Sequence, residues 1–316
     1  MLPRESFERP GMINPSGRHW SSNEDNGVRE YFRLLFSPDH WIMRGGRQLH
    51  LMRRITSPWR TLPDFIIIGA QKSGTTSLYN YMLQHPYIIG AATKEPDYFD
   101  HYYWRGILWY RSHFASRAFQ CYQRFCTGQR LLVGEASTNY LWHPHAPRRI
   151  AKCLPDVRLV VLLRNPIDRA YSNYYMTCRK GRETLPFSEA VAQEPQRIRG
   201  EMDKMRKNPG YYSLGFRHFA YLAKGHYAEQ LENWFQWIPR KQFLIIKSED
   251  FYKDIPGSLA RIWSFLGVLP VSWRNFPVYG KREYPQMDAD MRAFLEKHFR
   301  QPNARLSNLL GMSFLW

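Results

Sequence analysis

The stretch Phe65-Ile66-Ile67-Ile68-Gly69-Ala70-Gln71-Lys72-Ser73-Gly74-Thr75-Thr76-Ser77-Leu78 decides the fold of this chain. It begins with an apolar run short enough for a buried strand, continues through a small-residue turn and ends in a helix-like pattern. Backbone N–H groups at a helix N-terminus bind anions, and Lys72 adds a positive charge there. The stretch therefore predicts a strand–loop–helix element that holds a phosphate group. A purely structural turn is the alternative.

The order of the residues in the loop distinguishes between classes of phosphate site. Nucleotide-triphosphate loops place their lysine after the second glycine, whereas Lys72 precedes Gly74 here. The order Lys-Ser-Gly-Thr-Thr instead resembles the 5′-phosphosulfate loop of sulfotransferases, which use 3′-phosphoadenosine 5′-phosphosulfate (PAPS). The resemblance implies that the backbone amides of Ser73, Gly74, Thr75 and Thr76 hold the 5′-phosphate. It also implies that Lys72 neutralises the leaving phosphate.

A second apolar run, Arg158–Leu163, is followed by Arg164 and then by a helix-like pattern that Pro166 suits as a first-turn residue. A triphosphatase commonly ends such a strand in an aspartate that helps to hold Mg²⁺. Arginine instead binds anions in a bidentate manner and keeps its charge. The pair Arg164 and Ser172 resembles the element of sulfotransferases that binds the 3′-phosphate. An arginine that caps a surface loop, with a solvent-exposed serine, is the alternative.

The third motif is Lys94-Glu95-Pro96-Asp97-Tyr98-Phe99-Asp100. It resembles the Lys-Glu-x-x-x-Phe-Asp box of glycan sulfotransferases of the heparan-sulfate type, and this resemblance implies that Glu95 is the catalytic base. The later segment 279–285 resembles a basic loop that closes over the cofactor through Lys281 and Arg282. Sulfuryl transfer needs a deprotonated acceptor hydroxyl and cations near the leaving phosphate, and these residue types supply both. No metal-ligand spacing is present, and the resemblance implies no metal.

Two positions depart from the heparan-type pattern. Asp97 stands where many members of that branch have histidine, and Ala136 stands where they have lysine. Both departures concern the acceptor and the sulfuryl group, so they question heparan-like acceptor recognition more than sulfuryl transfer. Two other functions stay open: a P-loop nucleotide-dependent kinase, and a non-catalytic module on the same fold that binds polyanions.

The spacing of apolar runs predicts an α/β fold, with a P-loop-like parallel β-sheet and helices on both of its faces. Ligands of such sheets bind at the carboxyl ends of the strands, where the Lys72 loop and Arg164 both fall. We expect an N-terminal arm, residues 1–62, that is partly disordered or packed on the core, and a sulfotransferase domain, residues 63–316. The predicted strands are 64–69, 131–136, 158–163 and 242–247. The predicted helices are 75–84, 145–153, 166–179, 217–237, 255–266 and 287–298.

Composition limits the partners of the chain. It has 316 residues, of which 44% are hydrophobic, and a net charge of +18. This charge suits a carboxylated or sulfated carbohydrate acceptor and the anionic cofactor. Nucleic acid is not expected because no recognition motif for it is present. Cys121 and Cys126 are five residues apart and could form a disulfide, although free thiols in a reducing compartment are the preferred interpretation.

The sequence contains no signal peptide and no apolar run long enough for a transmembrane helix. Golgi glycan sulfotransferases typically have one membrane anchor. The chain is therefore expected in the cytoplasm if it is bacterial, or in the Golgi lumen if it is a fragment that lacks its anchor. Arginine and bulky apolar residues alternate within 31–44, so peripheral contact with a membrane is a hypothesis that flotation with anionic liposomes tests. Packing of this segment on the main domain is the alternative.

Overall fold

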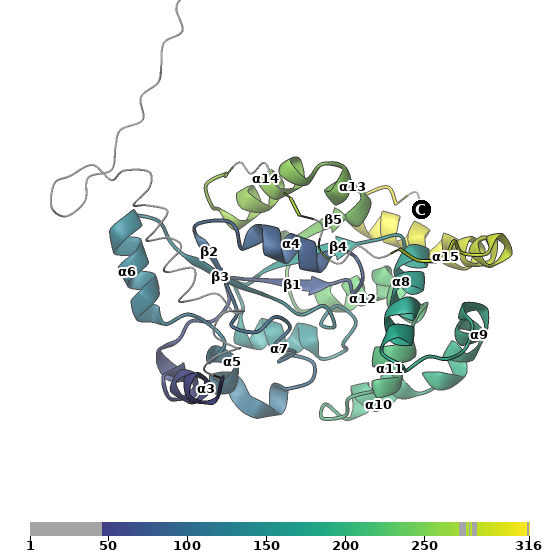
Figure 1. Ribbon diagram of the computed structural model, residues 1–316, viewed down its shortest axis with the longest axis horizontal. Helices are drawn as coiled ribbons and strands as arrows, with labels where there is room; N and C mark the ends of the chain where they lie inside the picture. Colours follow the sequence, from purple (N-terminus) through teal and green to yellow (C-terminus); the bar gives the residue numbers. More distant parts are fainter. Residues whose placement is uncertain (1–45, 272–275, 278, 280–282, 315) are drawn as a thin grey trace, which may run out of the picture. The chain divides into compact units, whose positions relative to one another are not determined.

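Five parallel strands form the central layer of the protein, seen here in a computed structural model (Figure 1). The structure describes residues 46–271, 276–277, 279, 283–314 and 316. The strands are β1 Phe65–Gly69, β2 Ile88–Gly90, β3 Leu132–Ala136, β4 Arg158–Leu163 and β5 Phe243–Lys247. Their order in the sheet is β2-β3-β1-β4-β5, and every neighbouring pair is parallel. The predicted α/β class is thus confirmed, and the four predicted strands match β1, β3, β4 and β5.

Successive residues of the strands face opposite layers of helices, as the two-residue repeat of a strand requires. Ile66 and Ile68 of β1 belong to one apolar cluster, together with side chains of α7 (Ala146–Cys153) and α12 (Tyr227–Phe235). Phe65 and Ile67 belong to the cluster on the other side of the sheet. That cluster includes side chains of α4 (Thr75–Met82), α13 (Ser248–Lys253) and α14 (Ile255–Leu266). Burial on both faces explains why these strands read as continuous apolar runs.

The remaining helices extend these layers. They are α3 Gly46–Ile55, α5 Gly106–Arg111, α6 Arg117–Thr127, α8 Pro166–Arg179, α9 Phe187–Arg197, α10 Glu201–Lys207, α11 Leu214–Phe219 and α15 Ala289–Leu310. Four short 3₁₀ helices are also present among the described residues: η1 Ser57–Trp59, η2 Tyr103–Arg105, η3 Ala223–Gly225 and η4 Arg240–Gln242. A third apolar cluster joins α8, α9 and α15, so that α8, which carries Ser172, is held beside the sheet (Figure 1).

One predicted helix, 217–237, is wrong as a continuous element. The chain forms α11 and α12 with η3 between them. The carboxylate of Glu194 accepts hydrogen bonds from the backbone N–H of Leu222, at 2.7 Å, and of Ala223, at 2.8 Å. These N–H groups would otherwise donate within a helix. Gly225 is also packed so closely that a Cβ there would lie 2.8 Å from the Phe299 ring. These tertiary contacts interrupt the helix.

Cys121 and Cys126 both lie on α6 as exposed free thiols. The chain divides into compact units Met1–Met52 and Arg53–Trp316. The domain boundary after residue 62 stays a prediction, and the segment 31–44 lies outside the described residues.

Candidate active site

The phosphate loop lies between the carboxyl end of β1 and the N-terminus of α4, as the sequence predicts. Gly74 precedes the helix with φ 92°, in the left-handed region that favours glycine. A Cβ at this position would lie 2.5 Å from the Tyr252 hydroxyl, so a side chain would be both strained and crowded. No side chain caps this helix end among the described residues, which is the arrangement expected of a helix N-terminus that binds an anion.

Ser73 is the most enclosed residue of the loop. Its side chain is fully buried, and its Oγ has no hydrogen-bond partner among the described residues. Its carbonyl oxygen accepts a hydrogen bond of 2.8 Å from the hydroxyl of Ser248, at the start of α13. A buried hydroxyl without a partner is costly unless a ligand satisfies it. The predicted phosphate loop thus contains one buried hydroxyl that is available to a ligand.

Arg164 lies at the end of β4, next to the phosphate loop. Its Nη1 donates to the carbonyl oxygen of Lys72 at 3.1 Å, although 92 residues separate the two in sequence. Its own carbonyl oxygen accepts a hydrogen bond of 2.9 Å from the hydroxyl of Tyr227 on α12. The adjacency of β1 and β4 in the sheet creates this contact. The structure therefore brings the two predicted cationic residues together.

Ser172 is buried in α8, and its Oγ lies 3.1 Å from the hydroxyl of Tyr284. Burial raises the pKa of Tyr284, but the hydrogen bond from Ser172 and the charge of Lys72 outweigh it, so the pKa lies below its usual value. Lys72 is therefore close enough to act on Tyr284 electrostatically. The predicted phosphate-binding residues thus converge on one region of the protein.

The basic loop lies partly outside the described residues, because Lys281 and Arg282 are not among them. Its described ends contact the site from two sides. Ser77 of α4 donates to the carbonyl oxygen of Tyr279 at 3.2 Å, and Tyr171 of α8 donates to that of Pro285 at 3.1 Å. The loop thus begins beside the phosphate-binding helix and ends beside the helix that carries Ser172.

Glu95 is partly exposed, with 37% of its side chain accessible. Its Oε1 lies 3.5 Å from Thr138 Oγ1 and 3.7 Å from Lys94 Nζ. Lys94 Nζ also donates to Thr76 Oγ1, at 2.6 Å, in the first turn of α4. Glu95 has φ 55°, a conformation that few residues other than glycine adopt. An accessible carboxylate is therefore connected to the phosphate loop through a lysine and a threonine.

Asp97 is a second carboxylate close to Glu95. Burial and the charge of Glu95 raise the pKa of Asp97 to about 6, although Arg217 opposes this effect. Arg217 Nη2 lies 3.3 Å from Asp97 Oδ2. Sequence reasoning missed Arg217 because it lies 120 residues away on α11 and no local pattern marks it. The position that departs from the heparan-type pattern thus carries a carboxylate paired with an arginine.

A fully buried carboxylate, Glu135, lies behind these groups and was also missed. It accepts hydrogen bonds from the hydroxyls of Tyr110 (2.5 Å), Ser137 (2.7 Å) and Tyr140 (3.2 Å). Burial, the largest cause, raises its pKa to about 7. Ser137 Oγ also accepts a hydrogen bond of 3.3 Å from the backbone N–H of Asp97. Glu135 therefore positions the segment that carries the acidic pair, and Ala136 beside it is fully buried.

The raised pKa of Glu135 predicts a pH dependence of stability. The folded state retains this proton up to about pH 7, whereas the unfolded chain loses it near 4.5. The free energy of unfolding should therefore fall as the pH rises between these values, by up to about 3 kcal/mol. Urea unfolding at several pH values checks this, with Glu135→Gln as the comparison. The variant should lack this part of the pH dependence, and parallel curves for the two proteins would contradict the assignment.

Within the described ranges, no group of three or more His, Cys, Asp or Glu side chains is arranged to hold a metal ion. The helices in those ranges include none with the length and apolar character needed to span a bilayer.

A parallel sheet with a predicted phosphate loop after β1 and an arginine after β4 is the arrangement of a P-loop-like α/β protein. The family model described as "Sulfotransferase domain" matches residues 62–272, and the chain belongs to that family. A crystal structure of a sulfotransferase from Alicyclobacillus acidocaldarius superposes with a TM-score of 0.61 at 32% identity. The match covers 80% of this chain and 98% of that one. The family, fold and enzyme class predicted from the sequence are thereby confirmed.

Curated relatives share most of this chain. "Membrane-associated sulfotransferase kil1" of Dictyostelium discoideum is 28% identical, over 81% of this chain and 66% of that protein. Human "Bifunctional heparan sulfate N-deacetylase/N-sulfotransferase 3" is 31% identical, over 79% of this chain and 30% of that protein. Human "Heparan sulfate glucosamine 3-O-sulfotransferase 6" is 27% identical, over 81% of this chain and 74% of that protein. The chain thus spans slightly under two thirds of the first of these proteins and under one third of the second.

Proposed function

We propose that this protein transfers a sulfuryl group from PAPS to a hydroxyl of a carbohydrate by in-line displacement. The observation that carries the proposal is the hydrogen bond between Arg164 and the carbonyl oxygen of Lys72, with Ser172 and Tyr284 nearby. A cofactor with phosphates at both its 5′ and 3′ positions needs two anion sites on neighbouring elements. The loop after β1 and the end of β4 provide them.

The residues present fit PAPS, which when bound supplies the sulfuryl group and a phosphate leaving group. The N–H groups of Gly74, Thr75 and Thr76 and the unpartnered Ser73 Oγ bind the 5′-phosphate, whereas the N–H of Ser73 donates to the carbonyl oxygen of Ala70 at 3.2 Å. Lys72 stabilises the negative charge that develops as the S–O bond breaks. Arg164 and Ser172 bind the 3′-phosphate, which distinguishes this cofactor from ATP. The sequence motif predicts that Lys281 and Arg282 close the site over the cofactor.

Glu95 removes the proton from the acceptor hydroxyl. Its accessible side chain and its contacts with Thr138 and Lys94 support this role, because a base must reach the substrate and be held in place. The sulfuryl group then passes to the acceptor oxygen, and the proton stays on Glu95.

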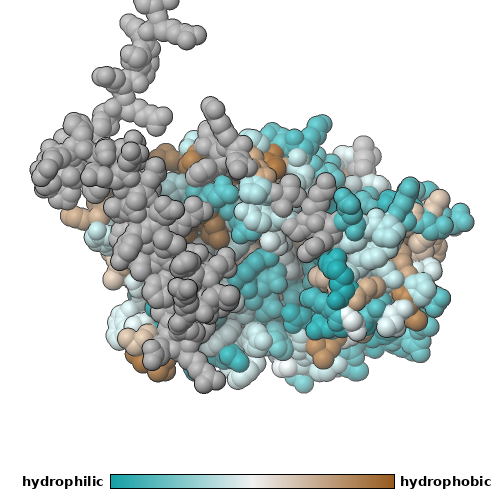
Figure 2. All heavy atoms as spheres, in the orientation of Figure 1, coloured by the Kyte–Doolittle hydropathy of each residue, from teal (hydrophilic) through white to brown (hydrophobic). Residues whose placement is uncertain are grey.

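The proposed acceptor is an anionic carbohydrate. Two of the human relatives are named for heparan sulfate, and this chain has a net charge of +18. Hydrophilic side chains cover much of the described surface in the view of Figure 2. Arg217, beside Asp97, supplies a cation close to Glu95 on the acceptor side. Peripheral membrane contact, and a location in the cytoplasm or the Golgi lumen, stay predictions.

Calorimetric titration with 3′-phosphoadenosine 5′-phosphate, the product without sulfate, tests the proposal. Binding is expected without Mg²⁺, and Arg164→Ala should weaken it about 10–100-fold, because a charge-assisted hydrogen bond to phosphate is lost. Arg206→Ala, at an exposed position of α10, is the matched control and should bind as the wild type does. Unchanged binding in Arg164→Ala, or a preference for Mg²⁺-ATP, would overturn the proposal and favour the kinase alternative.

A further inference from the structure

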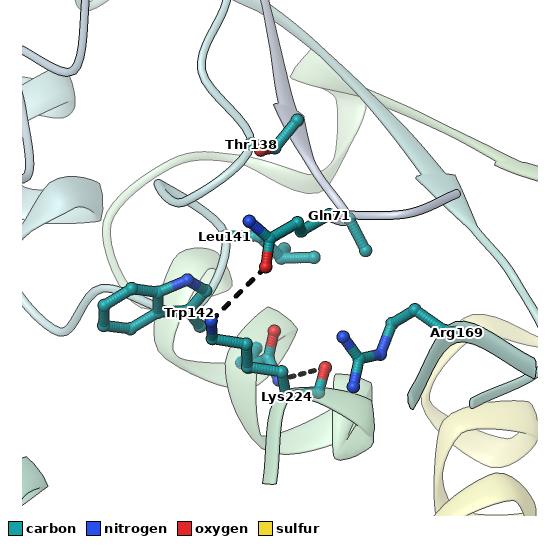
Figure 3. Close-up of a pocket in the computed structure, with 8 residues that line it drawn as sticks. Gln71, Thr138, Leu141, Trp142, Arg169 and Lys224 are labelled. Atoms are coloured by element: carbon teal, nitrogen blue, oxygen red, sulfur yellow. Dashed lines mark hydrogen bonds between the residues drawn. The ribbon is translucent and has the colours of Figure 1, made fainter. Parts of the chain in front are cut away.

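A small cavity lies beside the predicted phosphate loop. Its lining includes Gln71, Trp142, Arg169 and Lys224 (Figure 3). Its volume of about 10 Å³ corresponds to roughly one water-sized sphere. Figure 3 shows the side chains of Arg169 and Lys224 entering it from α8 and η3. Neither residue belongs to the proposed catalytic machinery.

Both cations are buried, and Arg169 is only partly satisfied. Arg169 is fully buried, and its Nη2 donates to the carbonyl oxygen of Tyr221. Its Nε and Nη1 have no hydrogen-bond partner among the described residues. Lys224 is 3% exposed. Its Nζ donates to the carbonyl oxygen of Arg217 at 2.6 Å and to Gln71 Oε1 at 3.4 Å, and it lies 5.1 Å from the centre of the Trp142 ring.

The charges around the cavity do not balance. Glu194 is the carboxylate whose charge acts on both Arg169 and Lys224. Its two oxygens accept backbone N–H groups of Leu222 and Ala223 instead of forming an ion pair with either cation. No salt bridge within 4 Å involves Arg169 or Lys224 among the residues that the structure describes. When Lys224 is charged, the two cations that line the cavity exceed the one carboxylate by a single positive charge, which one monovalent anion would neutralise.

We propose that this cavity binds one small monovalent anion, of the size of chloride, between the guanidinium of Arg169 and the ammonium of Lys224. An uncharged water molecule would fill the space but would leave the charge unbalanced. The unpartnered Nε and Nη1 of Arg169 are the donors that a halide accepts. The anion bridges Arg169 of α8 and Lys224 of η3. Lys224 also donates to Gln71, the residue before Lys72, so the anion stabilises the predicted phosphate loop.

The alternative is a neutral Lys224. Burial, followed by the charge of Arg169, lowers the pKa of Lys224 well below its usual range. In that case the charge of Arg169 is balanced by the charge of Glu194, and the cavity needs no anion. A bound anion would restore the charged form of Lys224, because an opposite charge favours it. The two possibilities therefore differ in whether halide stabilises the fold.

Thermal unfolding of the cofactor-free chain tests the proposal. The melting temperature is measured in sodium gluconate and in mixtures with sodium chloride or bromide at constant ionic strength. Halide should raise it saturably, by about 3 °C, because an anion that binds only the folded state stabilises that state. Lys224→Met should abolish this dependence. Lys207→Met, at an exposed position of α10, should retain it and corrects for general salt effects. Equal melting temperatures in gluconate and chloride for the wild type, or a halide effect that persists in Lys224→Met, would overturn the proposal.

Anomalous diffraction from crystals grown in bromide provides a second test that does not depend on how the variant folds. A bromide peak within hydrogen-bond distance of Arg169 Nη1 and Lys224 Nζ is expected. A cavity that holds only water in bromide would refute the anion site. Neither test involves PAPS, so a failure here leaves the proposed sulfotransferase activity unaffected.

Discussion

Glu95→Gln is expected to lower kcat about 10²–10⁴-fold while leaving affinity for 3′-phosphoadenosine 5′-phosphate unchanged. Glutamine has nearly the same shape as glutamate, so the contacts with Thr138 and Lys94 can persist. It cannot accept the acceptor's proton at neutral pH, so the hydroxyl remains a weak nucleophile. Turnover with radiolabelled PAPS and a carbohydrate acceptor, together with calorimetry of product binding, separates these two effects.

Glu296→Gln is the matched control for this variant, because Glu296 is exposed on α15, away from the phosphate loop. It should have wild-type turnover. Wild-type turnover in Glu95→Gln itself would remove Glu95 from the role of base. If neither the wild type nor the variant transfers sulfate to any carbohydrate although both bind the product, the non-catalytic polyanion-binding alternative would gain support.

Lys72→Ala is expected to reduce transfer about 10²–10³-fold, the usual effect of removing one group that stabilises developing charge. The lysine stands at the turn between β1 and α4 with φ 71°, and its charge acts on Tyr284 at the base of the basic loop. The negative charge on the leaving phosphate grows as the S–O bond breaks. The loss should therefore appear in kcat more than in the affinity for the desulfated product. Single-turnover transfer with saturating PAPS measures it.

Lys241→Ala, at an exposed position of η4, controls for the loss of one positive charge and should be nearly silent. A small loss in Lys72→Ala would mean that another cation performs this role. Lys94 is the first to examine, because its Nζ lies 2.6 Å from Thr76 Oγ1 in the same loop. The double variant Lys72→Ala/Lys94→Ala would then show a loss much larger than the product of the single effects.

The acceptor side of the site is where this chain differs most from the heparan-type pattern. Asp97 pairs with Arg217, and Ala136 is fully buried beside Glu135. A buried alanine cannot replace the charge of a lysine. Arg217 is held by a carboxylate on a different element, so it provides a cation that the motif itself does not encode. We therefore propose that residues of α11, as well as the Glu95 segment, contribute to recognition of the acceptor.

Local patterns in the sequence were sufficient to predict the strands and the loops that follow them. The apolar runs of β1, β3, β4 and β5 are buried on both faces, so each was recognisable from its composition. The phosphate loop and Arg164 each follow such a run, and the rule that parallel strands end at one edge of the sheet brought them together in the prediction. The edge strand β2 has only three residues, and no comparable pattern marks it.

By itself, the sequence determined the family and the α/β class, and it predicted the residues of the phosphate loop, because these depend on spacing within a few turns of chain. Tertiary structure decided the pairing of Asp97 with Arg217, the three hydroxyls around Glu135 and the meeting of Arg169 with Lys224. It also interrupted the predicted helix 217–237 through Glu194. The physical reason is the same throughout: burial of a charge needs partners, and those partners come from elements far apart in the sequence.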